Sequence, residues 1–420
     1  MMARVTVTAP STQAGTRDRS RRALLVALGV DNLGSGLFLP LALVYATRAV
    51  GLPLGVAGTV VAVGTAAGLL VPPFAGRLVD RTGPRTVVLA SQLLQAAGAL
   101  AYLVAQGLGL VLAAAVLLAA GQQTFYSALF ALVADVSPPG PKDRAFAMVN
   151  MVRSGAFGAG ALTAGVLLSS VDVVGLRIAV GVNAATFVVC AVLLALFVRD
   201  EHHAGQAAGP SPGTTPGVLH DRPYLALIAV TGLVALLTDV FLVGMPVFAL
   251  DVLHTPEWLP GVLLAVVTVL GSTLGTTAVR VTGRMTRTGA MMLGAAVGLV
   301  WCLLSLAALV VPDGWQVAWL LGTVPVLAAG SLLFGPRANA VAEAAAPRAV
   351  RGRYLAAFQY AFTVAGVVAP AVVALFTLGA WVPWAVVCAA TGLGIAGLRW
   401  VSGRLPSHAT TGAASGRMGV

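Results

Sequence analysis

The stretch Gly76–Arg85, GRLVDRTGPR, contains four charged residues in ten positions of a chain that is only 9% charged. Long apolar segments lie on both sides of it. The chain has 420 residues, 58% of them hydrophobic, and a mean hydropathy of +0.94. An α-helix needs about 20 apolar residues to cross the hydrocarbon core of a membrane, and these segments lack the polar face of a helix on the surface of a soluble protein. The sequence therefore predicts a membrane protein in which this stretch connects two spans.

Glycine, proline and charged residues divide the apolar sequence into segments of spanning length. We predict an all-α membrane protein with twelve transmembrane helices, at residues 23–47, 54–74, 87–106, 109–134, 145–169, 173–197, 224–249, 258–280, 289–311, 315–338, 354–376 and 380–401. A Gly-, Pro- and Thr-rich linker separates the sixth helix from the seventh. The expected organisation is a disordered cytoplasmic tail (1–22), a six-helix half (23–197), the cytoplasmic linker (198–222), a second six-helix half (223–402) and a cytoplasmic tail (403–420).

The basic residues predict the orientation. Twenty-one of the 25 lysines and arginines fall in the termini, the linker and the connections on one side, whereas only Arg48 and Arg177 fall on the other. Cytoplasmic segments carry such an excess, so we expect the protein in the cell membrane with both termini in the cytoplasm. The net charge of +11 then marks the cytoplasmic face, and no nucleic-acid partner is expected. The three cysteines lie inside apolar segments and the five histidines outside them, so we expect cysteine packing and neither a disulfide framework nor a metal.

The two halves repeat each other. The sequence GRLVDRTG at Gly76 recurs as GRMTRTG at Gly283, an offset of 207 residues. Asp31 and Asp239 are 208 residues apart, as are Asp135 and Glu343 at the ends of two predicted helices. Three matches at nearly one offset indicate an internal duplication. Because each copy has an even number of helices, the copies share one orientation, which is the parallel repeat of a large class of transporters.

In these features the chain resembles the major facilitator superfamily. The signature of that family between its second and third helices is matched by Gly76, Asp80, Arg81, Gly83 and Arg85, and the likeness covers roughly residues 20–402. The second copy lacks the acid, because Thr286 is followed directly by Arg287. The resemblance implies that this loop latches the two halves on the cytoplasmic side during alternating access. It further suggests an actinobacterial, drug-efflux-like type, although the predicted helix 145–169 lacks the Gly-Pro motif of drug/proton antiporters and 109–134 lacks their arginine.

Physical chemistry gives the same stretch a role. Gly76 and Gly83 permit a tight turn and a close approach of helices, and Asp80 is suited to accept hydrogen bonds from the positive N-terminus of a neighbouring helix. We further expect the arginines of the stretch (Arg77, Arg81 and Arg85) to pair with Asp135. The alternative is a hairpin that is basic merely because it is cytoplasmic.

Ionisable residues inside a membrane are costly and therefore candidates for function. Asp31 and its repeat mate Asp239 are expected to be protonatable coupling or substrate-cation sites, with Arg153 close to Asp31. A permanent buried ion pair or a structural carboxylate is the alternative. Arg337 lies near a helix end, where it could simply pair with Glu343. Uncharged candidates for a central cavity are Asn32, Gln122, Gln123, Tyr126, Asn150, Gln359 and Tyr360, for which interhelical hydrogen bonding is the alternative.

These observations predict a secondary transporter that works by alternating access. The sparse polar lining favours proton-coupled efflux of small amphipathic or hydrophobic compounds, and an uptake symporter is the closest alternative. No P-loop for ATP occurs, and neither HExxH nor GxSxG is present, which disfavours an enzyme. A non-transporting sensor or scaffold with the same fold is a further alternative. We expect a monomer with a small-molecule substrate, protons as the coupling ion and no cofactor.

Overall fold

The computed structural model describes residues 10–39, 42–138, 140–170, 173–198, 217–256 and 258–411. Within these ranges the regular structure is helical. The first half contains α1 (Pro10–Phe38), α2 (Ala42–Val44), α3 (Leu54–Gly68), α4 (Pro72–Thr82), α5 (Pro84–Leu103), α6 (Leu108–Val136), α7 (Asp143–Ser170) and α8 (Val173–Phe197). The second contains α9 (Arg222–Val247), α10 (Leu259–Val281), α11 (Arg287–Ala307), α12 (Asp313–Ala345), α13 (Arg351–Ala374), α14 (Val382–Ser402) and the short α15 (Ser407–Thr410). Tyr45–Ala49 and Phe248–Val252 add π-helical turns.

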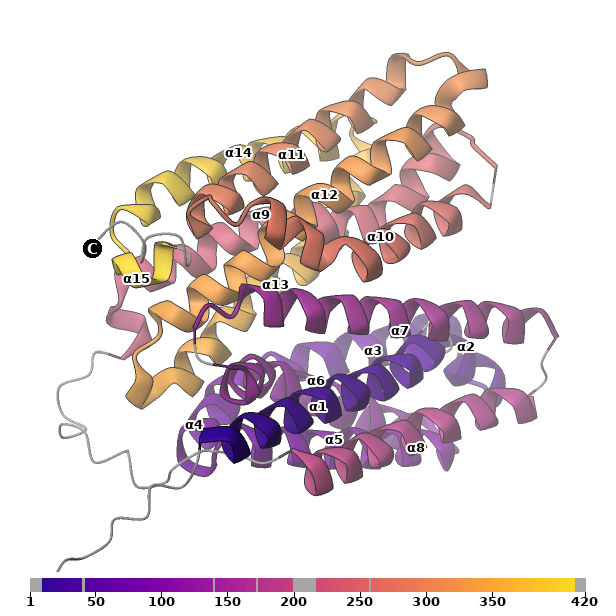
Figure 1. Cartoon of the computed structure of the whole chain (residues 1–420). Helices are drawn as coiled ribbons and strands as arrows, with labels where there is room; N and C mark the ends of the chain where they lie inside the picture. The colour runs from indigo at the N-terminus through magenta and orange to yellow at the C-terminus, as the bar shows by residue number, and fades with distance from the viewer. Residues whose placement is uncertain are drawn as a thin grey trace, which may run out of the picture.

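The predicted all-α fold of twelve spans is confirmed. In the described ranges, α1 with α2 and α3 with α4 form the first two spans, and α5 to α14 form the others. Nine of the helical segments are each long and apolar enough to cross a membrane. Figure 1 shows the two halves as separate bundles, α1 to α8 below and α9 to α14 above.

Three of the differences from the predicted boundaries bear on the site. α1 begins at Pro10, inside the predicted tail 1–22, where Asp18 pairs with Arg21 and Arg22 one turn away. Residues 1–9, and 199–216 of the linker, lie outside the described ranges. The predicted helix 54–74 is broken between α3 and α4, because Pro72 and Pro73 lack the N–H group that a continuous helix requires.

The charged stretch is the third difference, since most of it is helix. Gly76 to Thr82 belong to α4, and the chain reverses at Gly83 alone before Pro84 starts α5. Gly83 has φ +84°, a left-handed conformation that favours glycine. The predicted hairpin is therefore a short amphipathic helix, α4, followed by a reversal of the chain at a single residue, Gly83.

Glycines bring α1 and α7 into close contact within the first half. A Cβ atom at Gly36 would collide with the Phe157 carbonyl, and one at Gly160 would collide with the Leu33 carbonyl. Small residues at such positions let transmembrane helices approach closely. The glycine-rich stretch Gly155–Gly165 is thus a packing face, as its composition indicates.

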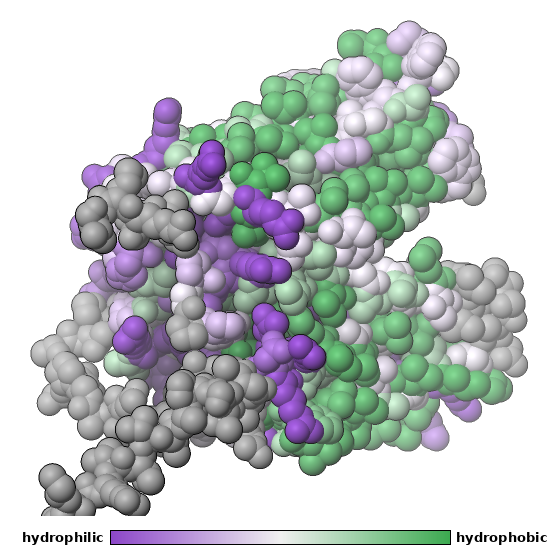
Figure 2. Space-filling model, viewed as in Figure 1, coloured by the Kyte–Doolittle hydropathy of each residue, from purple (hydrophilic) through white to green (hydrophobic). Residues whose placement is uncertain are grey.

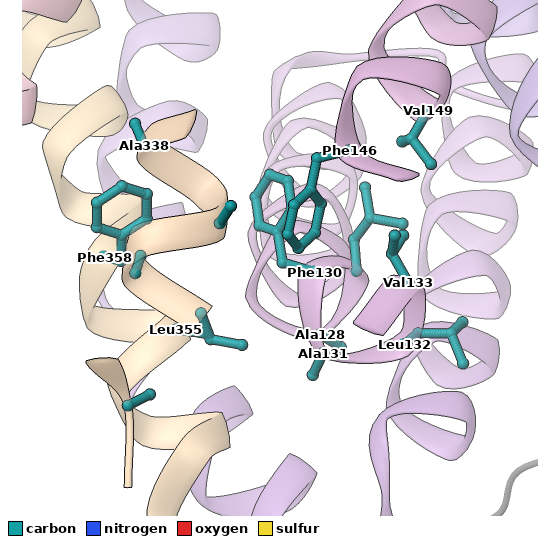
Figure 3. Close-up of a cluster of buried hydrophobic side chains, with 14 of the residues drawn as sticks. Ala128, Phe130, Ala131, Leu132, Val133, Phe146, Val149, Ala338, Leu355 and Phe358 are labelled. Carbon is teal, nitrogen blue, oxygen red and sulfur yellow. The ribbon is translucent and has the colours of Figure 1, made fainter. Parts of the chain in front are cut away.

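The two ends of the bundle differ. Hydrophilic side chains gather at the left of Figure 2, the side on which α4 and α15 lie in Figure 1, and we call this the basic end. At the opposite end, here the open end, the space-filling surface divides between the halves. Contacts between the halves run from α7 to α10 and α12, and from α4 and α6 to α13. Figure 3 shows the apolar layer near the basic end, where Leu355 and Phe358 lie across from Phe130 and Phe146.

Candidate functional site

Asp80 joins the halves at the basic end. Its Oδ1 accepts a hydrogen bond from the backbone N–H of Gly352 (2.6 Å), and its Oδ2 accepts one from the N–H of Arg353 (3.3 Å). These donors belong to the first turn of α13, so the carboxylate lies at the positive end of that helix. The Arg353 side chain adds an ion pair at 3.3 Å. The structure therefore places Asp80 against a helix N-terminus, which is the kind of contact that its sequence suggests.

Two glycines allow that contact. A Cβ atom on Gly76 would lie 2.8 Å from the Cβ of Ala356, and one on Gly352 would lie 2.7 Å from the carbonyl oxygen of Gly76. Any side chain at either position would push α4 away from α13 and lengthen the hydrogen bonds of Asp80.

The prediction that the arginines of the charged stretch pair with Asp135 was wrong. Its carboxylate pairs with Arg351 from the other half, and Arg351 also lies 3.5 Å from Glu343. Arg85 instead donates to the carbonyl of Ala195 at 2.6 Å, at the end of α8. Arg77 and Arg81 are exposed and have no ion pair to described residues. The tertiary arrangement brings the start of α13, rather than the arginines of the stretch, over the end of α6.

The second copy of the charged stretch, around Gly283, is also near a contact between the halves. This contact is a buried cluster of three charged side chains. Asp143, at the start of α7, accepts hydrogen bonds from Arg287 Nε (3.1 Å) and Nη2 (2.9 Å) and from Arg337 Nη1 (2.7 Å). The three side chains are at most 6% exposed. Arg337 also donates to the Thr282 hydroxyl (3.1 Å) rather than pairing with Glu343. A carboxylate shared by two arginines of the other half ties the bundles together at the basic end.

Sequence reasoning missed this cluster, although the repeat carries its signal. Asp143 and Arg351 are 208 residues apart and begin equivalent helices, and Asp80 and Arg287 are 207 residues apart. The first copy places the acid on the connection and the arginine on the facing helix. Asp80 pairs there with Arg353 at the start of α13. In the second copy Arg287 lies on the connection and pairs with Asp143 at the start of α7, so in both copies a charge on the connection meets the opposite charge at the start of a helix of the other half.

The short helix α15 closes over this cluster. Arg287 Nη1 lies 3.3 Å from the carbonyl oxygen of Ala409, and a ring nitrogen of His408 lies 3.0 Å from the carbonyl oxygen of Ala344. A cavity of about 580 Å³ beside it is lined by both halves, including Lys142, Arg348 and His408. The C-terminal segment thereby covers, from within the second half, the cluster that joins the halves.

Asp31 lies inside the first half rather than between the halves. Its side chain is buried and accepts hydrogen bonds from Gln92 of α5 (3.2 Å) and from its neighbour Asn32 (3.1 Å). Asn32 also donates to the Leu28 carbonyl. Arg153 forms no ion pair with Asp31 in the described structure. It donates instead to the Tyr126 hydroxyl at 2.6 Å and lies over that ring. Arg153 is near enough to act electrostatically on Asp31, as expected. The alternative of a permanent ion pair is not what the described residues show, because the two side chains bond to Gln92 and Tyr126.

Asp239, the repeat mate of Asp31, has a different environment. Its side chain is half-buried in the middle of α9, and no hydrogen bond or ion pair joins it to a described residue. A carboxylate at membrane depth is costly, so Asp239, which has no partner among the described residues, remains a candidate for function.

The remaining polar candidates divide into two groups. Tyr360 donates to the Leu69 carbonyl at 2.7 Å, and Gln123 lies 3.5 Å from the Thr363 hydroxyl, so both join the halves at mid-depth. The others do not link the halves by a side-chain hydrogen bond among the described residues: Gln122 is exposed, Asn150 is half-buried and Gln359 is buried with an unpaired amide nitrogen.

Beyond Thr363 the facing surface of the second half becomes exposed and apolar. Val364 and Val367, in the next turn of α13, are 52% and 53% exposed. The hydrogen-bonded contact of α13 with the first half therefore ends at about mid-depth, and Val364 and Val367 follow it.

The comparisons agree with this geometry. A profile of the Major Facilitator Superfamily matches residues 24–370, and no curated protein sequence matches the chain. Among solved structures, a bacterial homologue of the iron transporter ferroportin in its outward-facing state has a TM-score of 0.75 at 16% identity, covering 92% of this chain and all of that one. The fucose:proton symporter FucP of E. coli has a TM-score of 0.72 at 14% identity, with 91% and 98% coverage.

A third similar structure, the human organic anion transporter MFSD10, has a TM-score of 0.60 at 16% identity and covers 93% of this chain and all of that one. At these identities the structural likeness shows the fold alone, and the cargoes of the three proteins differ. The family profile spans most of the chain. The chain therefore belongs to the major facilitator superfamily and is a membrane transporter, not an enzyme.

Proposed function

We propose that this transporter works by alternating access and exchanges protons for small amphipathic or hydrophobic compounds, which it exports. The observation that carries the proposal is the asymmetry between its two ends. Buried charges join the halves at the basic end, whereas the halves separate beyond mid-depth at the other. A protein that exposes a central site to one side at a time requires this arrangement.

The structure then corresponds to the outward-facing state. The basic end is the cytoplasmic end by the distribution of lysine and arginine, so the open end faces outward. The contacts of Asp80, Asp135 and Asp143 act as the cytoplasmic closure in this state. They are expected to break when the halves rock to open the cytoplasmic side.

The cargo class follows from the lining. Exposed valines and few polar side chains suit an apolar or amphipathic compound, because a sugar needs many hydrogen-bonding partners. The unpaired Asp239 supports a positively charged or protonatable cargo, or a proton in its place. Asp31, which is buried away from the contact between the halves, is better suited to bind a proton than cargo.

An uptake symporter is the second candidate. The similarity in fold to a proton symporter favours it, and the same outward-open site could load cargo from outside. Export and uptake differ in whether cargo moves against or with the protons.

Transport by purified protein in sealed vesicles tests the proposal, with the lipophilic cation ethidium as the probe. A proton gradient should drive ethidium in the direction opposite to the protons. Asp239→Asn should remove the dependence of transport on the gradient, while Asp313→Asn, at the exposed first residue of α12, should not change it. Movement of ethidium with the protons would establish the symporter instead. Unchanged pH dependence in both Asp31→Asn and Asp239→Asn would leave these carboxylates a structural role.

A further inference from the structure

Two of the three cysteines meet inside the second half. The Sγ atoms of Cys302 in α11 and Cys388 in α14 are 2.9 Å apart, and neither is in a disulfide. Non-bonded carbon atoms rest about 3.5–4.0 Å apart, and sulfur is a larger atom than carbon. Sequence reasoning gave these cysteines separate packing roles, but the fold brings residues 86 positions apart into direct contact.

The surroundings hold both thiols in place. Trp301 and Trp384 are completely buried, with ring centroids 5.7 Å apart, and each lies on the same helix as one of the cysteines. The Cys302 thiol lies 3.4 Å from the Trp384 carbonyl, to which it can donate. Cys302 is buried and Cys388 is half-buried. The pair is therefore ordered by its neighbours and reachable from the side of Cys388.

The pair lies in the part of the bundle that approaches the open end. Cys388 is six residues after the start of α14, and Cys302 is five residues before the end of α11. At a rise of 1.5 Å per residue, they lie about 9 Å and 7.5 Å from those helix ends. With the basic end in the cytoplasm, the thiols are near the outer surface, where disulfides form and persist.

We propose that Cys302 and Cys388 form a reversible disulfide that staples α11 to α14. The two thiols lose two protons and two electrons as the S–S bond forms, and a membrane quinone accepts both and becomes the quinol. Thiol reductants reverse the step by exchange. Because both helices belong to the same half, the staple restrains that half without linking it to the other. Oxidation should therefore raise the unfolding temperature and leave the movement between the halves intact.

Thiol counting on the purified full-length protein tests the inference. The protein is incubated with a soluble quinone or with a reductant, denatured, and labelled with a maleimide whose addition is counted by mass. We expect three labels on the reduced protein and one on the oxidised protein, which should remain a monomer on a non-reducing gel. The matched control is Cys190→Ser, which removes the cysteine of the first half. We expect two labels on the reduced form of this variant and none on its oxidised form.

Two results would overturn the staple. One is an oxidised wild-type protein that still takes three labels. The other is a loss of labels through dimers that persist in Cys302→Ser, because the disulfide would then join Cys388 residues of different chains. The thiol count needs no transport, so its outcome is independent of the proposed cargo and coupling.

Discussion

Asp143→Asn should release the basic end of the bundle. The carboxylate neutralises Arg287 and Arg337, which both come from the opposite half and are 6% and 5% exposed. An amide of the same size cannot balance two guanidinium groups. In the outward-facing state the substitution leaves two buried cations without a counter-charge, whereas water hydrates them once the halves separate at this end. The cost therefore falls on one state of the transport cycle.

The size of the shift follows from the contacts that remain. Removing one partner of a buried ion pair costs about 3–5 kcal/mol. Arg337 keeps hydrogen bonds to the Val279 carbonyl (3.0 Å) and the Thr282 hydroxyl (3.1 Å), so the lower limit is the better estimate. A cost of about 3 kcal/mol changes the equilibrium between the two states by roughly 100-fold. The cytoplasm-open fraction should rise by that factor until it saturates.

A buried reporter can measure this change. Leu355, on α13, is 1% exposed and points towards the first half (Figure 3). In a chain whose native cysteines are replaced by serine, Leu355→Cys should react with a water-soluble maleimide only when the basic end opens. The reaction should be much faster with Asp143→Asn than with Asp313→Asn, an exposed acid at the open end that accepts a hydrogen bond from Gln316 of its own helix. Equal rates in the two variants would refute the reasoning.

Three further predictions concern the same end. Asp80→Asn should favour the cytoplasm-open state less than Asp143→Asn does, because the amide oxygen can still accept a hydrogen bond from the Gly352 N–H; an equal or larger effect in the reporter assay would contradict this. Leu219→Cys should react with impermeant reagent only from inside cells, and Gly314→Cys only from outside; the reverse would invert the topology. Truncation after Pro406 should speed reporter labelling, whereas truncation after Thr411 keeps α15 and should not; equal rates would remove α15 from the closure.

The fold followed from simple properties of the sequence. Segment length and hydropathy predict twelve helices because a membrane imposes one length on all of them. Pro72 and Pro73 indicate the break before α4. The prediction missed it because the apolar pattern continues through the two prolines. Hydropathy predicted the number of spans but hid this break, which the prolines indicate.

The site was harder to predict, and for a physical reason. Asp80 could be placed at a helix N-terminus from its charge and position, but its partner helix could not be identified. The partner of Asp135 depends on how the halves meet, which no local pattern determines. Asp143 was missed because the repeat was compared for similar residues, whereas Asp143 and Arg351, which are 208 residues apart, carry opposite charges. A comparison that pairs acids of one copy with bases of the other identifies Asp143 with Arg351 and Asp80 with Arg287.

The central claim is that the two ends open in turn. Spin labels on Thr86 and Ala349 report the separation of the halves at the basic end, and labels on Gln106 and Gly314 report it at the open end; all four positions are exposed. Distance distributions for both pairs should be measured in lipid with and without Asp143→Asn. Alternating access predicts that the substitution lengthens the basic-end distance and shortens the open-end distance. If both distances stay unchanged, or both lengthen together, the charge cluster does not control an alternating closure and the account is wrong.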